Sequence, residues 1–272
     1  MKNNMDMKRS IEDTSIAFIG AGNLATNLAK AFYRKGFRIK QIYSRTEESA
    51  KPLAEAVEAE YVTSLSDVAH HAQFYVVAVK DDALTPAFLS ALVSEREKGL
   101  WVHTAGSIPV DIWRHTGAGH YGVFYPMQTF SKSRPLDFKE IPIFVEGNND
   151  DTTARLEALG GALSGTVRRA TSEEREHLHL AAVFACNFTN HMYALALDVL
   201  RKYNLPFNLL LPLIDETARK VHALSPRQAQ TGPALRNDTG VMNAHLALLA
   251  DDERMRQLYG LISKSIHREA GD

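Results

Sequence analysis

The clearest fold signal in this chain is Ile16–Phe32, IAFIGAGNLATNLAKAF. An apolar run stops at Gly20-Ala21-Gly22, and a helix-like run follows with Ala25 as the third small residue. This GxGxxA pattern supplies a glycine for a tight turn, a second glycine that lets backbone approach a pyrophosphate, and a small residue for close helix–strand packing. The start of the helix presents free N–H groups and the positive end of its dipole to an anion.

The pattern predicts a dinucleotide site formed by six consecutive residues, Gly20, Ala21, Gly22, Asn23, Leu24 and Ala25. Glycine-rich turns also serve purely structural roles, so a fold that kept the turn without the ligand is the alternative. Here the motif follows a strand-like run and opens a helix-like run, which is the context that dinucleotide binding requires.

The end of the next strand-like run, Arg38–Tyr43, indicates which dinucleotide binds. It is followed by Ser44-Arg45-Thr46, at an offset of 24 (44 − 20) from the first glycine. An NAD site usually has Asp or Glu near this position, where it accepts hydrogen bonds from the ribose 2′-hydroxyl. An arginine between two hydroxyls suits a 2′-phosphate instead, because all three side chains donate hydrogen bonds. We expect NADP(H); the alternative is a surface arginine in a polar turn.

The composition is that of a globular protein, with 45% hydrophobic and 23% charged residues among 272. The 31 basic and 32 acidic residues nearly balance, so neither a nucleic-acid nor a membrane partner is expected. No apolar run approaches the roughly 20 residues that span a bilayer. The single cysteine, Cys186, cannot form an internal disulfide, which fits a reduced, cytoplasmic location.

Three segments are expected: a disordered leader over residues 1–14, a Rossmann NADP-binding domain over 15–169, and a helical substrate and dimerisation domain over 170–272. In the second segment short apolar runs alternate with amphipathic ones, as in a parallel α/β sheet. The expected strands are Ile16–Ile19, Ile39–Tyr43, Gln73–Val79, Leu100–His103, Tyr121–Tyr125, Ile141–Val145 and Thr166–Arg169. The expected helices are Asn23–Arg34, Glu47–Val57, Asp82–Ser94, Val110–His115 and Asp151–Leu163.

After Arg169 strand signals stop, and Thr171 with Glu174 forms a capping box for a long helix. The expected helices are Ser172–Tyr203, Pro206–Leu224, Pro226–Leu235 and Val241–His267. The first is unusually apolar from Leu178 to Leu200, which fits a central helix of the domain or one buried against a second subunit. The fold class is thus α/β, a Rossmann-type doubly wound sheet followed by an all-α C-terminal domain.

The turn after the Gln73–Val79 strand is expected to lie beside the cofactor, because doubly wound sheets bind ligands at the carboxyl ends of their strands. Val79, Lys80 and Asp81 are predicted to contact the cofactor mainly through their backbone, and Asp82 to cap the following helix.

Two later turns at the same edge carry polar residues. Thr104 and Ser107 are candidate catalytic hydroxyls, or they only cap turns. Gln128 is a candidate substrate-binding residue, or part of an ordered loop around Pro126. A serine hydrolase is not expected, because the chain has no G-x-S-x-G elbow.

The long helix carries polar residues at helical spacing. His179, Val183, Asn187 and Asn190 fall at offsets of 4, 8 and 11, hence on one α-helical face. Burying such polar groups without partners is costly, so His179 and Asn187 are candidate catalytic residues, the alternative being a satisfied core histidine. No HExxH and no cysteine cluster occurs, so no metal is expected.

A turn-rich segment, Thr231–Asp238, interrupts the helical patterns. Arg236 is a candidate for binding an anionic substrate, or it pairs with Asp238. His245 follows on the next expected helix. The segment is either a structural or a substrate loop.

In seven motifs the chain resembles a family of NADP oxidoreductases. Members of this family have a Rossmann-like N-terminal domain and a helical C-terminal domain of unknown function. The motifs are IGAGNLA, YSRT, AVKDDAL, HTAGS, FYPMQTF, HLAAVFACNFTNHM and TGPALRND, and they cover nearly the whole chain. More distantly the chain is similar to pyrroline-carboxylate reductases, prephenate dehydrogenases and β-hydroxyacid dehydrogenases. This resemblance implies a C-terminal domain like that of 6-phosphogluconate dehydrogenase, a small-molecule substrate and a homodimer.

One departure from the β-hydroxyacid dehydrogenases bears on mechanism. Their long helix has a catalytic lysine four residues before an asparagine; if Asn187 matches that asparagine, the lysine position is Val183. Valine cannot move protons, which argues against a simple hydroxyacid dehydrogenase.

The resulting hypothesis is an NADP(H)-dependent oxidoreductase that acts by hydride transfer on a small, anionic imine or carbonyl compound, with His179 as general acid. Trp101 and Trp113 are expected in or near the crevice. The alternatives are a non-catalytic NADP-binding sensor or partner-binding protein, and an enzyme that uses a deazaflavin as hydride partner.

Overall fold

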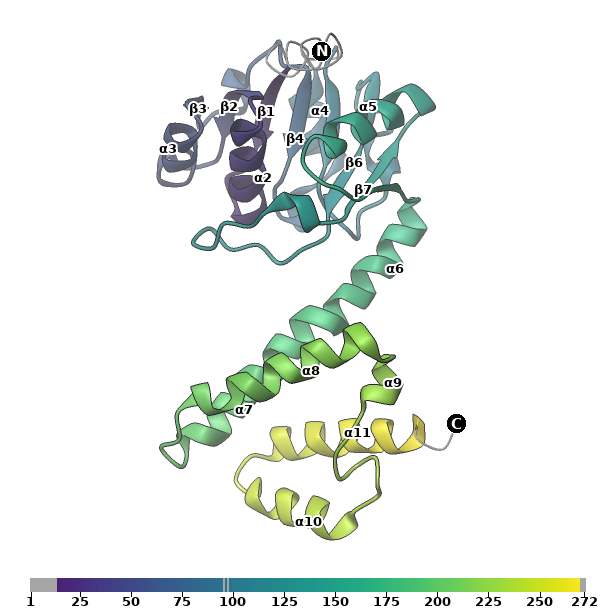
Figure 1. Cartoon of the computed structure of the whole chain (residues 1–272). Helices are drawn as coiled ribbons and strands as arrows, with labels where there is room; N and C mark the ends of the chain where they lie inside the picture. Colours follow the sequence, from purple (N-terminus) through teal and green to yellow (C-terminus); the bar gives the residue numbers. More distant parts are fainter. Residues whose placement is uncertain (1–13, 95, 97, 270–272) are drawn as a thin grey trace, which may run out of the picture. The chain divides into compact units, whose positions relative to one another are not determined.

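The chain was analysed as a computed structural model that describes residues 14–94, 96 and 98–269. Apart from Thr14, the expected leader over residues 1–14 lies outside the described residues. The chain divides into two compact units, the first ending at Cys186 and the second beginning at Asn187. Figure 1 shows the mixed α/β character of the first and the helices of the second. The domain boundary expected at residue 169 stays a prediction.

In the described part of the first unit, an eight-stranded sheet has the order β3-β2-β1-β4-β5-β6-β7-β8. Its strands are β1 (Ser15–Ile19), β2 (Arg38–Tyr43), β3 (Glu60–Val62), β4 (Phe74–Val77), β5 (Leu100–His103), β6 (His120–Pro126), β7 (Ile143–Gly147) and β8 (Val167–Arg169). The first six strands follow the order 3-2-1-4-5-6 of a Rossmann fold, which confirms the expected fold class. The order reverses between β1 and β4, and the ligand crevice is expected there.

Helices cover both faces of this sheet because side chains alternate along its strands. Ile16 and Phe18 of β1 pack in one apolar cluster with α2 (Asn23–Arg34), α3 (Glu47–Ala56) and α5 (Asp150–Gly161). Ala17 and Ile19 pack in the opposite cluster with α4 (Pro86–Val93). Figure 1 shows α2 and α5 on one face and α4 behind the strands.

Two features of the sheet differ from the expectation. β7 runs antiparallel to β6, with Phe124 opposite Val145, so the sheet is not wholly parallel. The edge strand β3 was not expected; it has three residues, too few to produce an alternating pattern.

Short 3₁₀ turns replace the start of one expected helix of this unit and the whole of another. The segment expected as one helix from Asp82 contains a 3₁₀ turn, Asp81–Ala83, and then α4. The segment from Val110 is a 3₁₀ turn that ends at Trp113.

The second half of the chain is helical. The long helix begins as α6 (Ser172–Ala182), passes through a π-helical segment (Val183–Phe188) and continues as α7 (Thr189–Arg201). The remaining helices are α8 (Leu211–Ala223), α9 (Pro226–Ala229), α10 (Thr239–Leu248) and α11 (Glu253–Glu269). The expected helix over 241–267 is therefore two helices. The expected capping box is present, because Thr171 accepts from the Glu174 N–H and Glu174 accepts from the Thr171 N–H.

The π-helical segment corrects the expected alignment of His179, Val183, Asn187 and Asn190. Its hydrogen bonds join residues i and i+5 rather than i and i+4, so α-helical spacing does not hold along residues 183–188. His179 precedes the segment, whereas Asn187 lies within it.

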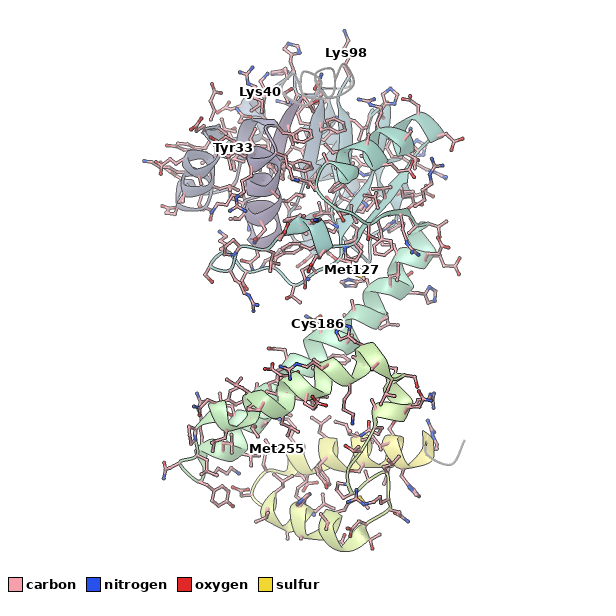
Figure 2. The ribbon with its side chains drawn as sticks, viewed as in Figure 1. Tyr33, Lys40, Lys98, Met127, Cys186 and Met255 are labelled. Carbon is pink, nitrogen blue, oxygen red and sulfur yellow. The ribbon has the colours of Figure 1, made fainter. Side chains whose placement is uncertain are left out.

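Among the described residues of the second unit, only Ala234 and Met255 are buried apolar residues. Figure 2 labels Met255 on α11. By length and composition alone the stretch Ser172–Arg201 could span a membrane, which the sequence analysis did not anticipate. A single helix of this kind is a weak indication, because core helices of other proteins pass the same test.

Candidate NADP site and active site

The turn between β1 and α2 has no room for a side chain at its first glycine. Gly20 has φ of +117°, and a Cβ atom there would lie 2.3 Å from the carbonyl oxygen of Ala78. The Gly20 N–H donates to the carbonyl of Tyr43 at 2.8 Å. The turn is thus held between the carboxyl ends of β2 and β4, and only glycine fits it.

The start of α2 fits a bound anion. Gly22 is the N-cap residue of α2. No side chain caps the helix, and the first turn of the helix contains no acidic residue. A Cβ atom on Gly22 would meet nothing within 4 Å, so the space beside the turn is open. Ala25 is fully buried, as the third small position of the motif requires. The free N–H groups of the first turn can therefore bind a pyrophosphate.

A cavity of about 610 Å³ lies beside this turn. It is lined by Gly20, Ala21, Gly22, Tyr43, Ser44, Arg45, Ala78, Val79, Lys80, Asp82, Ala83 and Phe88. Apart from Phe88 of α4, these residues lie at or just after the carboxyl ends of β1, β2 and β4, where a Rossmann fold binds its dinucleotide. The open space beside Gly22 leaves room for a pyrophosphate, and the Arg45 and Lys80 cations in this lining suit the phosphate groups of NADP(H).

Ser44 and Arg45 line this cavity, whereas Thr46 does not. Arg45 is exposed, and among the described residues no carboxylate forms an ion pair with it. The next acid in the chain, Glu47, accepts from Lys51 at 3.2 Å and from Tyr61 at 2.9 Å. Glu47 is thus already engaged, and the cation at this corner is available to an anionic group such as a 2′-phosphate.

The turn after β4 reaches from this cavity to the turn after β5. Val79 and Lys80 line the cavity, and the Asp81 carboxylate accepts from the Ser107 hydroxyl at 2.8 Å. Asp82 does not cap α4, because the hydroxyl of Thr85 accepts from the Phe88 N–H in that position.

The last residue of β5 is a buried histidine, and a tight turn follows it. His103 is fully buried and stacks on Trp113, with ring centroids 6.3 Å apart. Burial lowers the pKa of His103 to about 3, helped by the charge of Arg175, so this imidazole is neutral at pH 7. Thr104 is also buried. Ser107 bonds to Asp81 and does not cap the turn at Val110.

Trp101 and Trp113 do not lie in the crevice. Both are fully buried in the apolar cluster on the α4 face, where Trp101 stacks on Tyr75 at 4.0 Å. The expectation was wrong because Trp101 lies near the amino end of β5, away from the crevice, and Trp113 ends the 3₁₀ turn that packs on the α4 face of the sheet.

A tyrosine and a histidine meet at the carboxyl ends of β5 and β6. The Tyr125 hydroxyl and His179 Nδ1 are 3.0 Å apart, and the two rings are T-shaped at 6.0 Å. A Cβ atom on Gly106 would lie 2.7 Å from the same Nδ1, so the imidazole packs directly on this glycine. His179 thus belongs to the turn region that adjoins the cofactor cavity through Ser107 and Asp81.

A buried ion pair fixes the start of α6 against the sheet. The Arg175 guanidinium, 1% exposed, binds the Glu146 carboxylate of β7 at 2.5 Å. It also donates to the carbonyl of Ile108 at 2.6 Å, and Ser172 donates to Glu146 at 2.8 Å. This network ties α6 to β7 and to the turn after β5.

Sequence reasoning missed Tyr125, Arg175 and Glu146. The position of Tyr125 at the end of an expected strand was the available signal. The sequence contains no signal for the ion pair, because its two residues are 29 positions apart, one in a strand and the other in a helix.

The remaining candidates stay predictions. Gln128 is exposed after β6, and its side-chain oxygen accepts from the Thr129 N–H at 2.8 Å. Asn187 is exposed in the π-helical segment. Arg236 is exposed and does not pair with Asp238, which instead caps α10. Within the described residues no group of three or more His, Cys, Asp or Glu is arranged to hold a metal ion.

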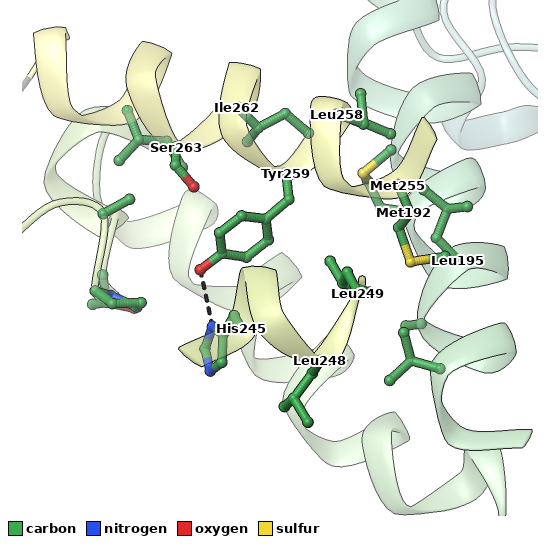
Figure 3. Close-up of a pocket in the computed structure, with 16 residues that line it drawn as sticks. Met192, Leu195, His245, Leu248, Leu249, Met255, Leu258, Tyr259, Ile262 and Ser263 are labelled. Carbon is green, nitrogen blue, oxygen red and sulfur yellow. Dashed lines mark hydrogen bonds between the residues drawn. The ribbon is translucent and has the colours of Figure 1, made fainter. Parts of the chain in front are cut away.

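A second cavity, of about 420 Å³, lies within the second unit between α7, α10 and α11 (Figure 3). Its walls are mostly apolar, with Met192, Leu195 and Leu258 among them. Its main polar feature is a hydrogen bond of 2.9 Å between His245 Nδ1 and the Tyr259 hydroxyl. His245 thus faces an apolar cavity of the helical unit.

Two sequence families match the chain. One is described as "NADP oxidoreductase coenzyme F420-dependent" and matches residues 15–103; the other is a domain of unknown function, DUF2520, and matches residues 141–266. The crystal structure of a "putative NADP oxidoreductase" from Bacteroides fragilis is 61% identical, with a TM-score of 0.91, over 95% of this chain and 99% of that one. The chain belongs to this NADP oxidoreductase family. It is an oxidoreductase, and its cofactor is NADP(H).

More distant structures share the fold of this NADP oxidoreductase. An imine reductase from Myxococcus stipitatus, in complex with NADP⁺, is 21% identical over 94% of each chain, with a TM-score of 0.69. A pyrroline carboxylate reductase from Plasmodium falciparum, with NADP bound, is 14% identical over 94% of this chain and 99% of that one, with a TM-score of 0.62. No curated protein matches the chain.

Proposed function

We propose that this oxidoreductase reduces a small, anionic imine or carbonyl compound with NADPH, and that His179 supplies the proton. When bound, the nicotinamide supplies the hydride. The unsaturated carbon gains that hydride, and the nitrogen or oxygen gains a proton from the His179 imidazole. The observation that carries the proposal is the position of His179, which packs on Gly106 at the carboxyl edge of the sheet.

The cofactor contacts belong to the same proposal. Residues 20–25 would hold the pyrophosphate, Ser44, Arg45 and Thr46 the 2′-phosphate, and residues 79–81 the neighbouring part of the cofactor. The open space beside Gly22 and the charge of Arg45, which has no ion pair among the described residues, support these contacts.

Two observations support this substrate class: the fold shared with imine reductases, and an exposed arginine. Structures of imine reductases and of a pyrroline carboxylate reductase are among those with the same fold. Arg236 is an exposed cation without an ion pair among the described residues, which suits an anionic substrate. Thr104, Ser107, Gln128 and Asn187 are further candidates for substrate contact.

The test is NADPH consumption with 1-pyrroline-2-carboxylate, 2-methyl-1-pyrroline and small 2-keto acids. We expect His179→Asn to lower turnover on the order of 10²-fold or more, as for loss of a general acid, and to leave NADPH affinity unchanged. His177→Asn is the matched control, because that exposed histidine bonds only to the Glu173 carbonyl of its own helix. Unchanged turnover of His179→Asn would remove this residue from the mechanism.

A second candidate reaction is hydride exchange between NADP(H) and a deazaflavin. The family description that matches residues 15–103 names coenzyme F420, which favours it. Adding F420 to the NADPH assay separates the two reactions: reduction of F420 with no turnover of imines or keto acids would replace the first proposal.

We also propose that the protein is a homodimer joined through its helical unit. Large apolar side chains of this unit remain exposed in a single chain, among them Leu209, Leu213, Leu248 and Leu261. Each copy of the chain exposes the same apolar surface on this unit. When two copies pack these surfaces together, each buries the other's apolar side chains and the unit gains a core. The cavity of Figure 3 opens among these helices.

Sedimentation equilibrium tests the dimer directly. We expect twice the chain mass at micromolar concentration, and dissociation with loss of helical stability in Leu261→Asp, whose leucine is 67% exposed. A stable monomer with a cooperative thermal transition would contradict the dimer.

A further inference from the structure

We propose that Tyr125 is a positioning residue for His179, whose hydroxyl fixes the imidazole through Nδ1 and leaves Nε2 to exchange the proton with the substrate. This inference rests on the proposed function only in giving His179 the role of proton donor. The hydrogen bond itself is independent of that role.

The imidazole is held from two sides. Its Nδ1 lies 3.0 Å from the Tyr125 hydroxyl, and its ring packs on the backbone of Gly106, where no Cβ atom fits. The aromatic rings meet edge to face, with an interplanar angle of 70°. A side chain with one hydrogen bond and one packed face has little rotational freedom left, which is what a proton donor of fixed direction requires.

The two nitrogen atoms of His179 differ in their surroundings. Nδ1 is engaged by Tyr125, which is the only hydrogen bond of the His179 side chain among the described residues, so Nε2 forms none there. His179 is half-buried, but Tyr125 is only 7% exposed. The histidine is therefore the member of the pair that can touch a substrate, and the tyrosine acts behind it.

The hydroxyl of Tyr125 remains protonated at neutral pH. Burial raises the pKa of Tyr125; the charge of Arg175 opposes the rise and that of Asp81 adds to it. A neutral phenol can donate to an unprotonated Nδ1 and can accept from a protonated one. The hydrogen bond therefore persists in both protonation states of His179, before and after proton transfer.

The charged groups around the pair come from three elements. Arg175 lies on α6 with His179 and is paired with Glu146 of β7. Asp81, after β4, is bonded to Ser107. The buried His103 of β5 stays neutral at pH 7.

The first test needs neither cofactor nor substrate. The full-length protein with ¹⁵N-labelled histidine is titrated by NMR as wild type, Tyr125→Phe and Tyr121→Phe. Tyr121 is the matched control, because it lies on the same strand and its hydroxyl forms no hydrogen bond within the described residues. We expect the pKa or the tautomer ratio of His179 to change in Tyr125→Phe alone. An unchanged His179 in Tyr125→Phe would overturn the proposal, even if the protein reduces imines.

The second test is a double-mutant cycle on turnover. In the wild-type background we expect Tyr125→Phe to lower kcat about tenfold, with KM nearly unchanged. In the His179→Asn background the same substitution should have no further effect, because the effects of two residues are not additive when one acts through the other. The same loss in both backgrounds would show that Tyr125 acts on its own. If no substrate is found, the NMR titration still decides the positioning role.

Discussion

Gly20 and Gly22 lie two residues apart in one turn, but an added methyl group would meet different surroundings at each. At Gly20 it would collide with the Ala78 carbonyl and require a positive φ. At Gly22, φ is −75° and the space is open, so alanine fits the protein without its cofactor.

We expect Gly20→Ala to lower the free energy of unfolding by roughly 1–3 kcal/mol or more, because the backbone strain cannot relax. Gly22→Ala should keep the stability of the wild type but weaken NADPH binding at least about tenfold, since its methyl group lies where the pyrophosphate approaches. Urea unfolding and calorimetric titration measure the two effects. NADPH affinity at the wild-type level in Gly22→Ala would mean that the pyrophosphate does not bind at this turn.

His103 makes stability sensitive to acid. Its folded-state pKa of about 3 lies below the ordinary value of 6.5, so the unfolded chain takes up a proton that the folded chain refuses. Stability is therefore full above pH 6.5 and falls, by up to about 1.4 kcal/mol per pH unit from this residue, as the pH drops toward 3. The free energy of unfolding, measured with urea at several pH values between 7 and 4, should fall less steeply with decreasing pH for His103→Leu than for the wild type. Parallel curves would contradict the lowered pKa of His103 as the cause.

The residues of the cofactor turn could be predicted, whereas the pair of Tyr125 and His179 could not. Gly20 and Ala25 belong to a local motif whose spacing alone specifies strand, turn and helix. Tyr125 and His179 are 54 residues apart, and their contact exists only because β6 ends beside the start of α6. His179 was found as a polar residue on an apolar helix, but nothing in the sequence named its partner.

At the scale of elements, the junction of α6 with the sheet depends on one buried ion pair. Removing one partner of such a pair leaves a buried charge uncompensated, which costs about 3–5 kcal/mol. We expect Glu146→Gln to lower the free energy of unfolding by that amount, because Arg175 is 1% exposed. The double variant Glu146→Leu, Arg175→Met should recover much of the loss. A neutral effect of Glu146→Gln in urea unfolding would show that solvent reaches the guanidinium.

The elements themselves were predicted where local patterns are strong. The helix Asn23–Arg34 and the strand Leu100–His103 have the expected bounds, because a turn motif or a buried apolar run delimits each. The direction of β7 was not predictable, since alternation of side chains is the same in parallel and antiparallel strands. The π-helical segment was missed for a similar reason: its residues are ordinary helix formers, and only the backbone shows the extra residue in the turn.

At the scale of the whole molecule, the two units differ in how they are stabilised. The first has apolar clusters on both faces of its sheet. The described part of the second buries little apolar surface in a single chain. The sequence left open whether the apolar run Leu178–Leu200 forms a domain core or a subunit interface, because both need the same residues. The exposed apolar residues of this run in a single chain are among the observations behind the proposed dimer.

We propose that the cavity beside Gly20 binds NADP(H) and that Arg45 recognises its 2′-phosphate. The most direct test is calorimetric titration of the wild type and Arg45→Ala with NADPH and with NADH; calorimetry is preferred because Trp101 and Trp113 are buried away from the crevice. Arg38→Ala is the matched control, an exposed arginine at the other end of the same strand. Loss of a charge-assisted hydrogen bond, roughly 1.5–3 kcal/mol, should weaken NADPH binding to Arg45→Ala about 10- to 150-fold and leave NADH binding nearly unchanged. Equal losses for both cofactors, or none for either, would contradict the account.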